Sequence, residues 1–436
     1  MQKTKMENFQ YNKGKLFVEG VSVIDIVNAV GTPLYCYSAT AIKKNYKTFK
    51  AALTNLDAEI FFSLKANSNV GVLATLARLG AGADIVSGGE LTRALIAGFP
   101  PNKIVFSGVG KSREELSQAL SAGIKQFNVE SESELDLLSA IATRSKMCAP
   151  VAIRVNPNVD ARTHSKITTG TNENKFGVTM DDAKRLYAKG SKMNGIHTVG
   201  IAVHIGSQLT QLAPYRRAYE KIGELVSFLR NEGYNVEVID LGGGLGISYL
   251  DEIPPTPFEY GLMVENVVGD LGCSIGFEPG RVIVGNAGLL VSQVIYVKEG
   301  KDRPFLIVDA AMNDLLRPAL YDAYHEIFPI KETGLNISSV RYDVVGPICE
   351  TSDTFGIDRN LPKMEAGDFI AFSNAGAYGA VMASTYNSRP LIPEVIVDGT
   401  RFAIVAKKVC TEELLKREKL PPWLEMQNED MEANPG

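Results

Sequence analysis

The stretch KIVFSGVGKSREELSQALSAGIKQFNVE, residues 103–130, decides the fold. It starts with the short apolar run KIVF (103–106) and ends with a second one, QFNV (126–129), and such runs predict buried strands. Between them, SREELSQALSAG (112–123) has the pattern of an amphipathic helix that ends at a glycine. A strand, a helix and a further strand imply parallel strands joined by a right-handed crossover.

The same unit recurs on both sides of this stretch. Eight strand-like runs over about 220 residues match the size of a (β/α)8 barrel. A doubly wound open sheet is the alternative, because the pattern alone separates the two poorly. The other six runs are EIFFSL (59–64), ADIV (83–86), VAIRV (151–155), TVGIAVH (198–204), VEVID (236–240) and SIGFE (274–278).

The rhythm changes after about residue 282, where strand-like runs follow one another across short turns rich in Gly, Pro and Asp. This pattern predicts an antiparallel β-barrel or β-sandwich domain. The first 35 residues also read as strand–turn–strand and are expected to join it. We therefore predict a barrel domain over 36–281, a discontinuous β domain over 1–35 and 282–415, and a flexible polar tail over 416–436.

Composition excludes several classes of protein. Apolar residues make up 45% of the 436 residues and charged residues 22%, which is ordinary for a folded chain with a sizeable core. The net charge of −5 gives no basic excess, so nucleic acid is not expected as a partner. No apolar run is long enough for a membrane span, and the N-terminal residues do not resemble a secretory signal.

Cysteine and histidine usage argues against a metal site or a disulfide framework. The five cysteines are an odd number without any CxxC pair, and the four histidines lack metal-ligand spacing. We therefore expect no metal and a cytoplasmic location, where thiols stay reduced.

Polar and ionisable residues follow the predicted barrel strands. In a (β/α)8 barrel the working residues lie just past the carboxyl ends of the strands. Surface charges scattered without a function would not fall there so consistently. These positions are Lys65, Asp84 to Ser87, Ser107, Glu130, Arg154 to Asn156, His204, the glycines at 242–244, and Glu278.

Two of these positions suggest covalent and ring-binding chemistry. Lys65 directly follows an apolar strand, where desolvation would lower its pKa and leave an amine able to form a Schiff base. His204, at another strand end, has an imidazole that can stack on a planar ligand or move protons. The simpler alternatives are a lysine that reaches solvent and a structural histidine, and each is the more common outcome for an isolated case.

Two loops suggest anion binding. In VIDLGGGLG (238–246) the glycines allow the backbone to approach a phosphate, although the run is neither GxGxxG nor a P-loop. In FEPGR (277–281), Glu278 can bond a protonated heterocyclic nitrogen and Arg281 a phosphate or carboxylate. A tight turn and a surface salt bridge are the alternatives for these two loops.

The C-terminal part adds three further candidate motifs. Cys349 precedes Glu350, whose charge would keep the thiol protonated, so that it could act as a general acid. Tyr378 lies between small residues, a shape suited to close approach by a ligand. Arg317 and Tyr321 are one turn apart and share a face if the segment is helical.

Each motif is weak alone, but their order and spacing resemble one family, the fold-type III pyridoxal-phosphate decarboxylases. The resemblance extends from about residue 33 to about 410 and is strongest to the branch that acts on meso-diaminopimelate. The segment HSKITTGTNENKFG (164–177) also resembles a loop of that branch. The motifs are FFSLKAN (61–67), GADIVSGGEL (82–91), HIGSQ (204–208), GGGLG (242–246), EPGR (278–281), RPALY (317–321), GPICE (346–350) and GAYG (376–379).

The resemblance implies a fold and a set of residue roles. The fold would be a (β/α)8 barrel followed by an antiparallel β domain, and the cofactor pyridoxal 5'-phosphate. Lys65 would form the Schiff base, His204 would stack on the ring, Glu278 would hold the ring nitrogen and Cys349 would donate a proton. Further cofactor contacts would be Asp84, Ser207, Gly243, Gly280, Arg281 and Tyr378, and substrate contacts Arg281, Arg317, Tyr321, Glu350 and Tyr378.

The resemblance also implies a homodimer with shared active sites, which Cys349 and its neighbours would enter from the other subunit, and an amino acid as substrate. Arg281 and Arg317 suit a distal carboxylate, and Glu350 a distal ammonium, as in meso-diaminopimelate. Decarboxylation would then give L-lysine. The alternatives are a decarboxylase of ornithine, arginine or carboxynorspermidine, and an inactive homologue that only binds a partner.

Overall fold

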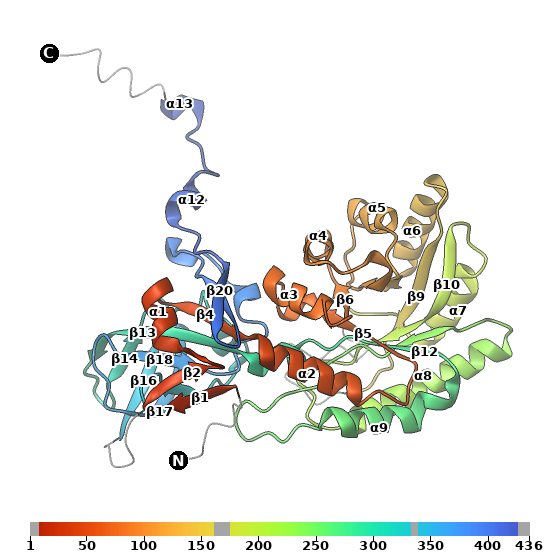
Figure 1. Ribbon diagram of the computed structural model, residues 1–436. Helices are drawn as coiled ribbons and strands as arrows, with labels where there is room; N and C mark the ends of the chain where they lie inside the picture. Colours follow the sequence, from red (N-terminus) through yellow and green to blue (C-terminus); the bar gives the residue numbers. More distant parts are fainter. Residues whose placement is uncertain (1–7, 161–174, 333–338, 426–436) are drawn as a thin grey trace.

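The computed structural model describes residues 8–160, 175–332 and 339–425. Its larger part is a closed barrel of eight parallel strands in the order β5-β6-β7-β8-β9-β10-β11-β12, with β12 paired to β5 (Figure 1). This confirms the predicted (β/α)8 barrel and excludes the open sheet. The strands are β5 Ala58–Ser63, β6 Gly82–Ile85, β7 Ile104–Phe106, β8 Gln126–Val129, β9 Ala149–Val155, β10 Ile196–Val203, β11 Val238–Asp240 and β12 Ser274–Phe277.

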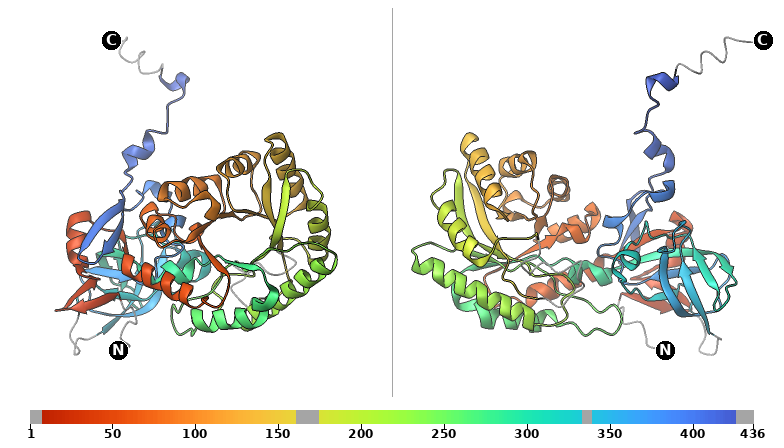
Figure 2. Two further views of the ribbon diagram at one scale, coloured as in Figure 1. Left: turned by 45° about the vertical axis from the view of Figure 1, so that its right-hand side comes forward. Right: turned by 180° about the vertical axis from the view of Figure 1, so that it is seen from behind.

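Helices surround the barrel as an outer ring, which is seen in the left view of Figure 2. Local sequence sets their ends: Ser112 caps α5 and forms a reciprocal capping box with Glu115, and Gly123 ends the helix in a left-handed conformation. The helices are α2 Ala39–Ala51, α3 Val70–Ala77, α4 Gly88–Ala97, α5 Arg113–Ala122, α6 Glu132–Arg144, α7 Met180–Gly190, α8 Ala213–Asn231 and α9 Pro257–Val268.

A second, mixed β sheet lies beside the barrel (Figures 1 and 2). Its main path is β17-β16-β14-β13-β4-β19-β20, and β18 pairs with β13 and with β15. The strands are β4 Leu34–Ser38, β13 Gly288–Lys298, β14 Phe305–Val308, β15 Ile327–Pro329, β16 Ser339–Val345, β17 Thr354–Pro362, β18 Phe369–Phe372, β19 Glu394–Asp398 and β20 Arg401–Ala406.

This sheet differs from the prediction in two respects. Most pairings are antiparallel, but β14 pairs with β16, and β4 with β19, in parallel. Strands β15 and β17 were not predicted, since the first is short and the second has polar residues at its centre, Asp358 to Asn360. Of these, Arg359 and Asn360 pair with β16 at the edge of the sheet.

The N-terminal segment contributes one strand to this sheet. Strand β4 lies between β13 and β19, and β1 Phe9–Asn12, β2 Lys15–Val18 and β3 Val21–Ser22 form a small antiparallel sheet. Helix α1 Val23–Val30 follows, and Val23 and Ile26 share an apolar core with Leu34 and Leu289. The two ends of the chain therefore build one layer next to the barrel.

The C-terminal segment extends away from the body of the molecule (Figure 1). It contains the short helices α12 Thr411–Leu415 and α13 Pro422–Glu425. The predicted flexible tail over 416–436 therefore includes one helix, and its residues 426–436 lie outside the described part. The described residues include no helix of the length and apolarity that a membrane span requires.

Candidate active site

The barrel places Lys65 and Asp84 in direct contact. Lys65 follows β5 in a single 3-10 turn, η1 Leu64–Ala66, and Asp84 belongs to the neighbouring strand β6. Lys65 Nζ lies 2.6 Å from Asp84 Oδ2, which also accepts a hydrogen bond from Ser63 Oγ at 2.8 Å. The Asp84 carboxylate is fully buried, whereas about a third, 34%, of the Lys65 side chain is exposed.

Lys65 is protonated in the structure, so the expectation that desolvation leaves it a neutral amine is wrong. Burial lowers the pKa of Lys65, but the carboxylates of Asp84 and Glu278 raise it by more, so that the pKa lies above its ordinary value. Lys65 is therefore an ammonium in the ligand-free chain. It must lose a proton before it can act as a nucleophile.

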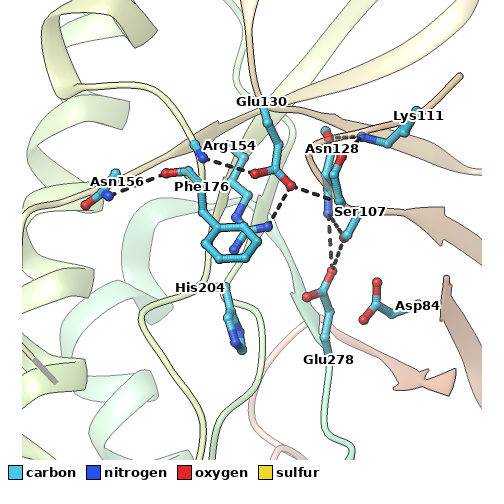
Figure 3. A network of polar contacts seen from close by, with 12 residues as sticks. Asp84, Ser107, Lys111, Asn128, Glu130, Arg154, Asn156, Phe176, His204 and Glu278 are labelled. Carbon is cyan, nitrogen blue, oxygen red and sulfur yellow. Dashed lines mark hydrogen bonds and ion pairs between the residues drawn. The ribbon is translucent and has the colours of Figure 1, made fainter. Parts of the chain in front are cut away.

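Three carboxylates, those of Asp84, Asp240 and Glu278, lie together at the buried end of the site. Glu278 follows β12, and its Oε1 accepts hydrogen bonds from Ser107 Oγ at 3.1 Å and Asn128 Nδ2 at 3.2 Å (Figure 3). Asn128 also lies 3.3 Å from Asp240 Oδ2. Burial raises the pKa of Glu278 well above its ordinary value, and the charges of Asp240 and Asp84 raise it further. This carboxyl group is suited to share a proton with a basic ring nitrogen.

His204 follows β10, and its imidazole is held in one tautomer. Its Nδ1 accepts a hydrogen bond from the backbone N–H of Gly243 at 3.1 Å, so the ring hydrogen lies on Nε2. Burial lowers the pKa of His204 well below its ordinary value, as do the charges of Arg154 and Lys65. The histidine is therefore a neutral, flat ring, as stacking on a planar ligand requires.

The glycine-rich loop after β11 has no room for side chains. A Cβ on Gly243 would lie 2.1 Å from the carbonyl oxygen of Glu278, and one on Gly244 2.2 Å from that of Gly206. Gly280 is also crowded, because its Cβ would lie 2.9 Å from that of Ala66. The loops that carry Lys65, His204 and Glu278 are thus packed together through glycine backbone.

A cavity of about 320 Å3 opens beside this loop and is lined by Arg281, Arg317, Tyr321, Tyr378 and Ser207, among others. Arg281 begins the short helix α10 Arg281–Val284 and donates a hydrogen bond to Ser207 Oγ at 3.0 Å. Arg317 and Tyr321 are the first and last residues of helix α11 Arg317–Tyr321, in agreement with their helical spacing in the sequence. The structure therefore brings together the predicted anion-binding residues from the barrel and the β sheet.

Cys349 and Glu350 do not line this cavity. They lie exposed in the turn between β16 and β17, where Cys349 Sγ donates to Asn387 Oδ1 at 3.3 Å and Glu350 accepts from Ser352 Oγ at 3.0 Å. The buried carboxylate of Asp353 holds this turn by accepting the backbone N–H of Ile348 at 2.6 Å. Among the described residues, the cavity of a single chain is thus formed without the predicted acid and its neighbour.

A buried ion-pair network supports the strand ends on the far side of Glu278 (Figure 3). Glu130 Oε1 lies 2.7 Å from Arg154 Nη1, and Glu130 Oε2 accepts the backbone N–H of Gly177 at 3.0 Å. Lys111 pairs with Glu134 at 2.7 Å and donates to the carbonyl oxygen of Asn128 at 2.7 Å. The network fixes Asn128, and through it Glu278. Most of the predicted loop 164–177 lies outside the described residues.

Sequence reasoning missed four contributors to the site. Asp240 and Asn128 are polar residues inside apolar strands, and that unusual placement was the available signal. Tyr249, which lines the cavity, and His325, which contacts Arg317, lie in loops without a recognisable pattern.

Comparison with known proteins gives consistent results along the whole chain. Residues 39–285 match the family model "Pyridoxal-dependent decarboxylase, pyridoxal binding domain". The diaminopimelate decarboxylase of Zymomonas mobilis is 45% identical over 421 residues, which cover 95% of this chain and 99% of the relative. That of Pseudomonas aeruginosa is 46% identical over 417 residues, 96% of this chain and 100% of the relative.

Solved structures agree with the sequence comparison. The diaminopimelate decarboxylase of Helicobacter pylori, complexed with L-lysine, superposes with a TM-score of 0.88 at 42% identity and covers 90% of this chain and 98% of its own. The enzyme of M. jannaschii, also in complex with L-lysine, gives a TM-score of 0.90 at 36% identity, with 96% of this chain and 99% of its own covered.

Proposed function

The chain belongs to the diaminopimelate decarboxylases within the pyridoxal-dependent decarboxylase family, and we propose how its own residues carry out the reaction of these enzymes. It converts meso-2,6-diaminopimelate to L-lysine and CO2 with pyridoxal 5'-phosphate. This reaction is the last step of lysine synthesis. The observation that supports the substrate assignment best is the arginine pair at the cavity, Arg281 and Arg317. Two guanidinium groups suit a substrate whose far end carries a carboxylate.

The residues present fit the cofactor. Asp84 Oδ1 and Arg281 Nε are buried polar atoms without a hydrogen-bond partner among the described residues, so both atoms are available to a bound ligand. In our proposal Lys65 would hold the aldehyde carbon, Glu278 would hold the ring nitrogen and His204 would stack on the ring, while Asp84 contacts Lys65. Gly243, Ser207 and Gly280 would surround the phosphate, and Arg281 and Tyr378 would contact both the cofactor and the substrate.

The protein's own contribution is binding, orientation and proton placement. When bound, pyridoxal phosphate supplies a conjugated ring that accepts the electron pair left on Cα as CO2 departs. Glu278 would support this because its carboxyl group, whose pKa burial raises, can give its proton to the ring nitrogen and then hold the protonated nitrogen with the resulting negative charge. His204, being neutral, would cover the ring without adding a positive charge beside it. Asp84 positions Lys65 by their 2.6 Å contact.

We propose that the missing acid comes from a second copy of the chain. Cys349 and Glu350 are exposed on a rigid turn and do not line the cavity of their own chain, which supports a homodimer with shared sites. Cys349 of one subunit would protonate Cα in the site of the other. Glu350 would hold the distal ammonium, while Arg281, Arg317, Tyr321 and Tyr378 hold the distal carboxylate.

We further propose a cytoplasmic location and a two-domain division. All five cysteines are free, which suits a reducing compartment. The division follows the predicted one, but the first boundary moves from 35/36 to 38/39, because β4 pairs with β13 and β19.

The test is CO2 release by the cofactor-loaded protein from meso-diaminopimelate, L-ornithine, L-arginine, L-lysine and carboxynorspermidine in parallel. Release from meso-diaminopimelate alone, with L-lysine as product, is the expected result. Release from another amine would keep the mechanism and change the substrate. No release from any of them, with cofactor bound, would favour an inactive binding homologue.

A further inference from the structure

His325 is fully buried behind the arginine pair and has one defined tautomer. Its Nδ1 lies 2.7 Å from the carbonyl oxygen of Ser373, and its Nε2 lies 2.9 Å from Arg317 Nη1. A carbonyl oxygen only accepts and a guanidinium only donates. The ring hydrogen must therefore lie on Nδ1, and the lone pair of Nε2 accepts the hydrogen bond from Arg317.

Tyr249 links the two arginines. Its hydroxyl accepts a hydrogen bond from Arg281 Nη1 at 2.7 Å, and its ring centre lies 4.4 Å from Arg317 Cζ. The ring of His325 meets that of Tyr249 edge to face, with ring centres 5.6 Å apart. The side chain of Tyr249 thus contacts both guanidinium groups, that of Arg281 through its hydroxyl and that of Arg317 through its ring.

The hydrogen-bond acceptors of the two arginines are neutral, although Glu252 and Asp322 also line the cavity. Within the described part of the chain, no carboxylate forms an ion pair with Arg281 or Arg317, whose hydrogen-bond acceptors are Tyr249, Ser207 and His325. Burial lowers the pKa of Arg317, and the charge of Arg281 lowers it further. A carboxylate in place of these acceptors would cancel the positive charge that an anionic ligand needs. Neutral acceptors instead orient the arginines and leave their charge available.

His325 remains neutral under working conditions. Burial lowers the pKa of His325 to about 3, and the charge of Arg317 acts in the same direction. Ser373, whose carbonyl oxygen accepts from Nδ1 of His325, is itself held in place. Its backbone N–H donates a hydrogen bond to the backbone carbonyl oxygen of Glu326 at 2.9 Å.

We propose that Tyr249 and His325 are positioning residues that hold Arg281 and Arg317 as a cationic pair without an ion-paired carboxylate, and thereby select substrates with a carboxylate at the distal end. This inference rests on the proposed function and names the residues that set its selectivity. L-Lysine keeps the distal carboxylate of meso-diaminopimelate, whereas cadaverine, the diamine without it, does not. The two ligands therefore report on the arginine pair without any turnover.

The test compares His325→Phe, His325→Gln and Tyr249→Phe in the cofactor-loaded protein. His325→Phe removes the acceptor for Arg317, and we expect KM for meso-diaminopimelate to rise roughly ten- to a hundredfold, the range for a lost hydrogen bond to a charged group, with kcat nearly kept. His325→Gln retains an amide oxygen and should recover most of the affinity. Tyr249→Phe keeps the ring but removes the acceptor for Arg281, and it should also raise KM.

The second readout is the preference for L-lysine over cadaverine, measured by titration of the cofactor's visible absorbance. It should fall in His325→Phe and Tyr249→Phe and stay unchanged in the control His197→Phe, whose side chain is 55% exposed on β10. Unchanged KM and unchanged ligand preference in both His325→Phe and Tyr249→Phe would overturn the inference. Equal losses of kcat, bound cofactor and Tm in these two variants and in His325→Gln would also overturn it, since such losses indicate a purely structural role. If the wild type releases no CO2 from meso-diaminopimelate, the proposed function fails instead.

Discussion

The backbone N–H of Tyr378 donates a hydrogen bond to the carbonyl oxygen of Ala66 at 2.8 Å. Asn67 Nδ2 adds a second bond, to the carbonyl oxygen of Gly376 at 3.0 Å. The turn that carries Lys65 in the barrel is thereby fastened to a loop of the β sheet. Tyr378 has a left-handed φ of 55° and lies against Arg281, with 4.8 Å between its ring centre and Cζ. The site is therefore complete only when both parts of the molecule are folded.

We predict that Lys65→Ala abolishes turnover and removes the visible absorbance of the lysine-linked cofactor, because the amine that holds the cofactor is lost. Absorbance spectra and CO2 release measure the two effects. Lys43→Ala is the matched control, since Lys43 pairs with Asp398 outside the site and should keep both. Full activity of Lys65→Ala would contradict the assignment.

Cys349→Ala should retain the cofactor while product formation falls about 10²–10⁴-fold, the usual contribution of a general acid. The comparison is with Cys410→Ala, which removes another exposed thiol and should leave the rate unchanged. Unchanged turnover in Cys349→Ala would move the acid role to another group.

Mixed dimers test whether Cys349 acts across the subunit interface. Equal amounts of Lys65→Ala and Cys349→Ala chains, refolded or co-expressed, should recover about a quarter of wild-type activity, because half of the dimers then contain one intact site. Mixtures that remain inactive would argue for sites formed within a single chain.

Gly243→Ala should weaken cofactor binding at least about tenfold and lower Tm. Its Cβ would lie 2.1 Å from the carbonyl oxygen of Glu278, so the glycine loop and the Glu278 segment must move apart. Cofactor titration and thermal unfolding measure these effects. Gly110→Ala, where nothing lies within 4 Å of the added Cβ, is the control, and equal behaviour of the two variants would refute the close-packing argument.

His325 predicts a pH dependence of stability. Its pKa is lowered from 6.5 to about 3 by burial and by the charges of Arg317, Arg281 and Arg359. Between these values the unfolded chain binds a proton that the folded chain does not, so stability falls as the pH is lowered from 6.5 towards 3, by up to about 1.4 kcal/mol per pH unit. Above pH 6.5 the group contributes no slope.

His325→Gln should therefore flatten the dependence of the unfolding free energy on pH between about 4.5 and 6.5, as measured by urea unfolding. His204, whose pKa is also lowered, remains in both proteins and cancels in the comparison. Identical slopes would mean that His325 is protonated in the folded chain.

The barrel could be predicted from the sequence because its strands are short apolar runs bounded by capped helices. All eight predicted runs agree with the observed strands to within two residues at each end. Strand β17 could not be found this way, since its centre, Asp358 to Asn360, is polar. It forms as an edge strand through its pairing with β16. The parallel pairing of β4 with β19 joins segments too distant for local patterns to indicate.

The candidate site was predictable where a motif combines a strand end with an unusual residue, as at Lys65 and Glu278. The charge of Lys65 was not, because it depends on Asp84, a neighbour in space that outweighs desolvation. Tyr249 escaped detection for a related reason: its importance comes from Arg281 and Arg317, which belong to other segments. His325 lies only 8 residues after Arg317, but the contact between them appears only in the folded chain.

The position of β4 between β13 and β19 has a consequence for synthesis on the ribosome. Residues 34–38 leave the ribosome early, but their partners at 288–298 and 394–398 follow only after the entire barrel. A chain ending at residue 285 would contain every barrel strand and still expose both edges of β4. The nascent chain must keep this strand unpaired until its last strands emerge, and an isolated barrel fragment is expected to aggregate rather than serve as a minimal enzyme.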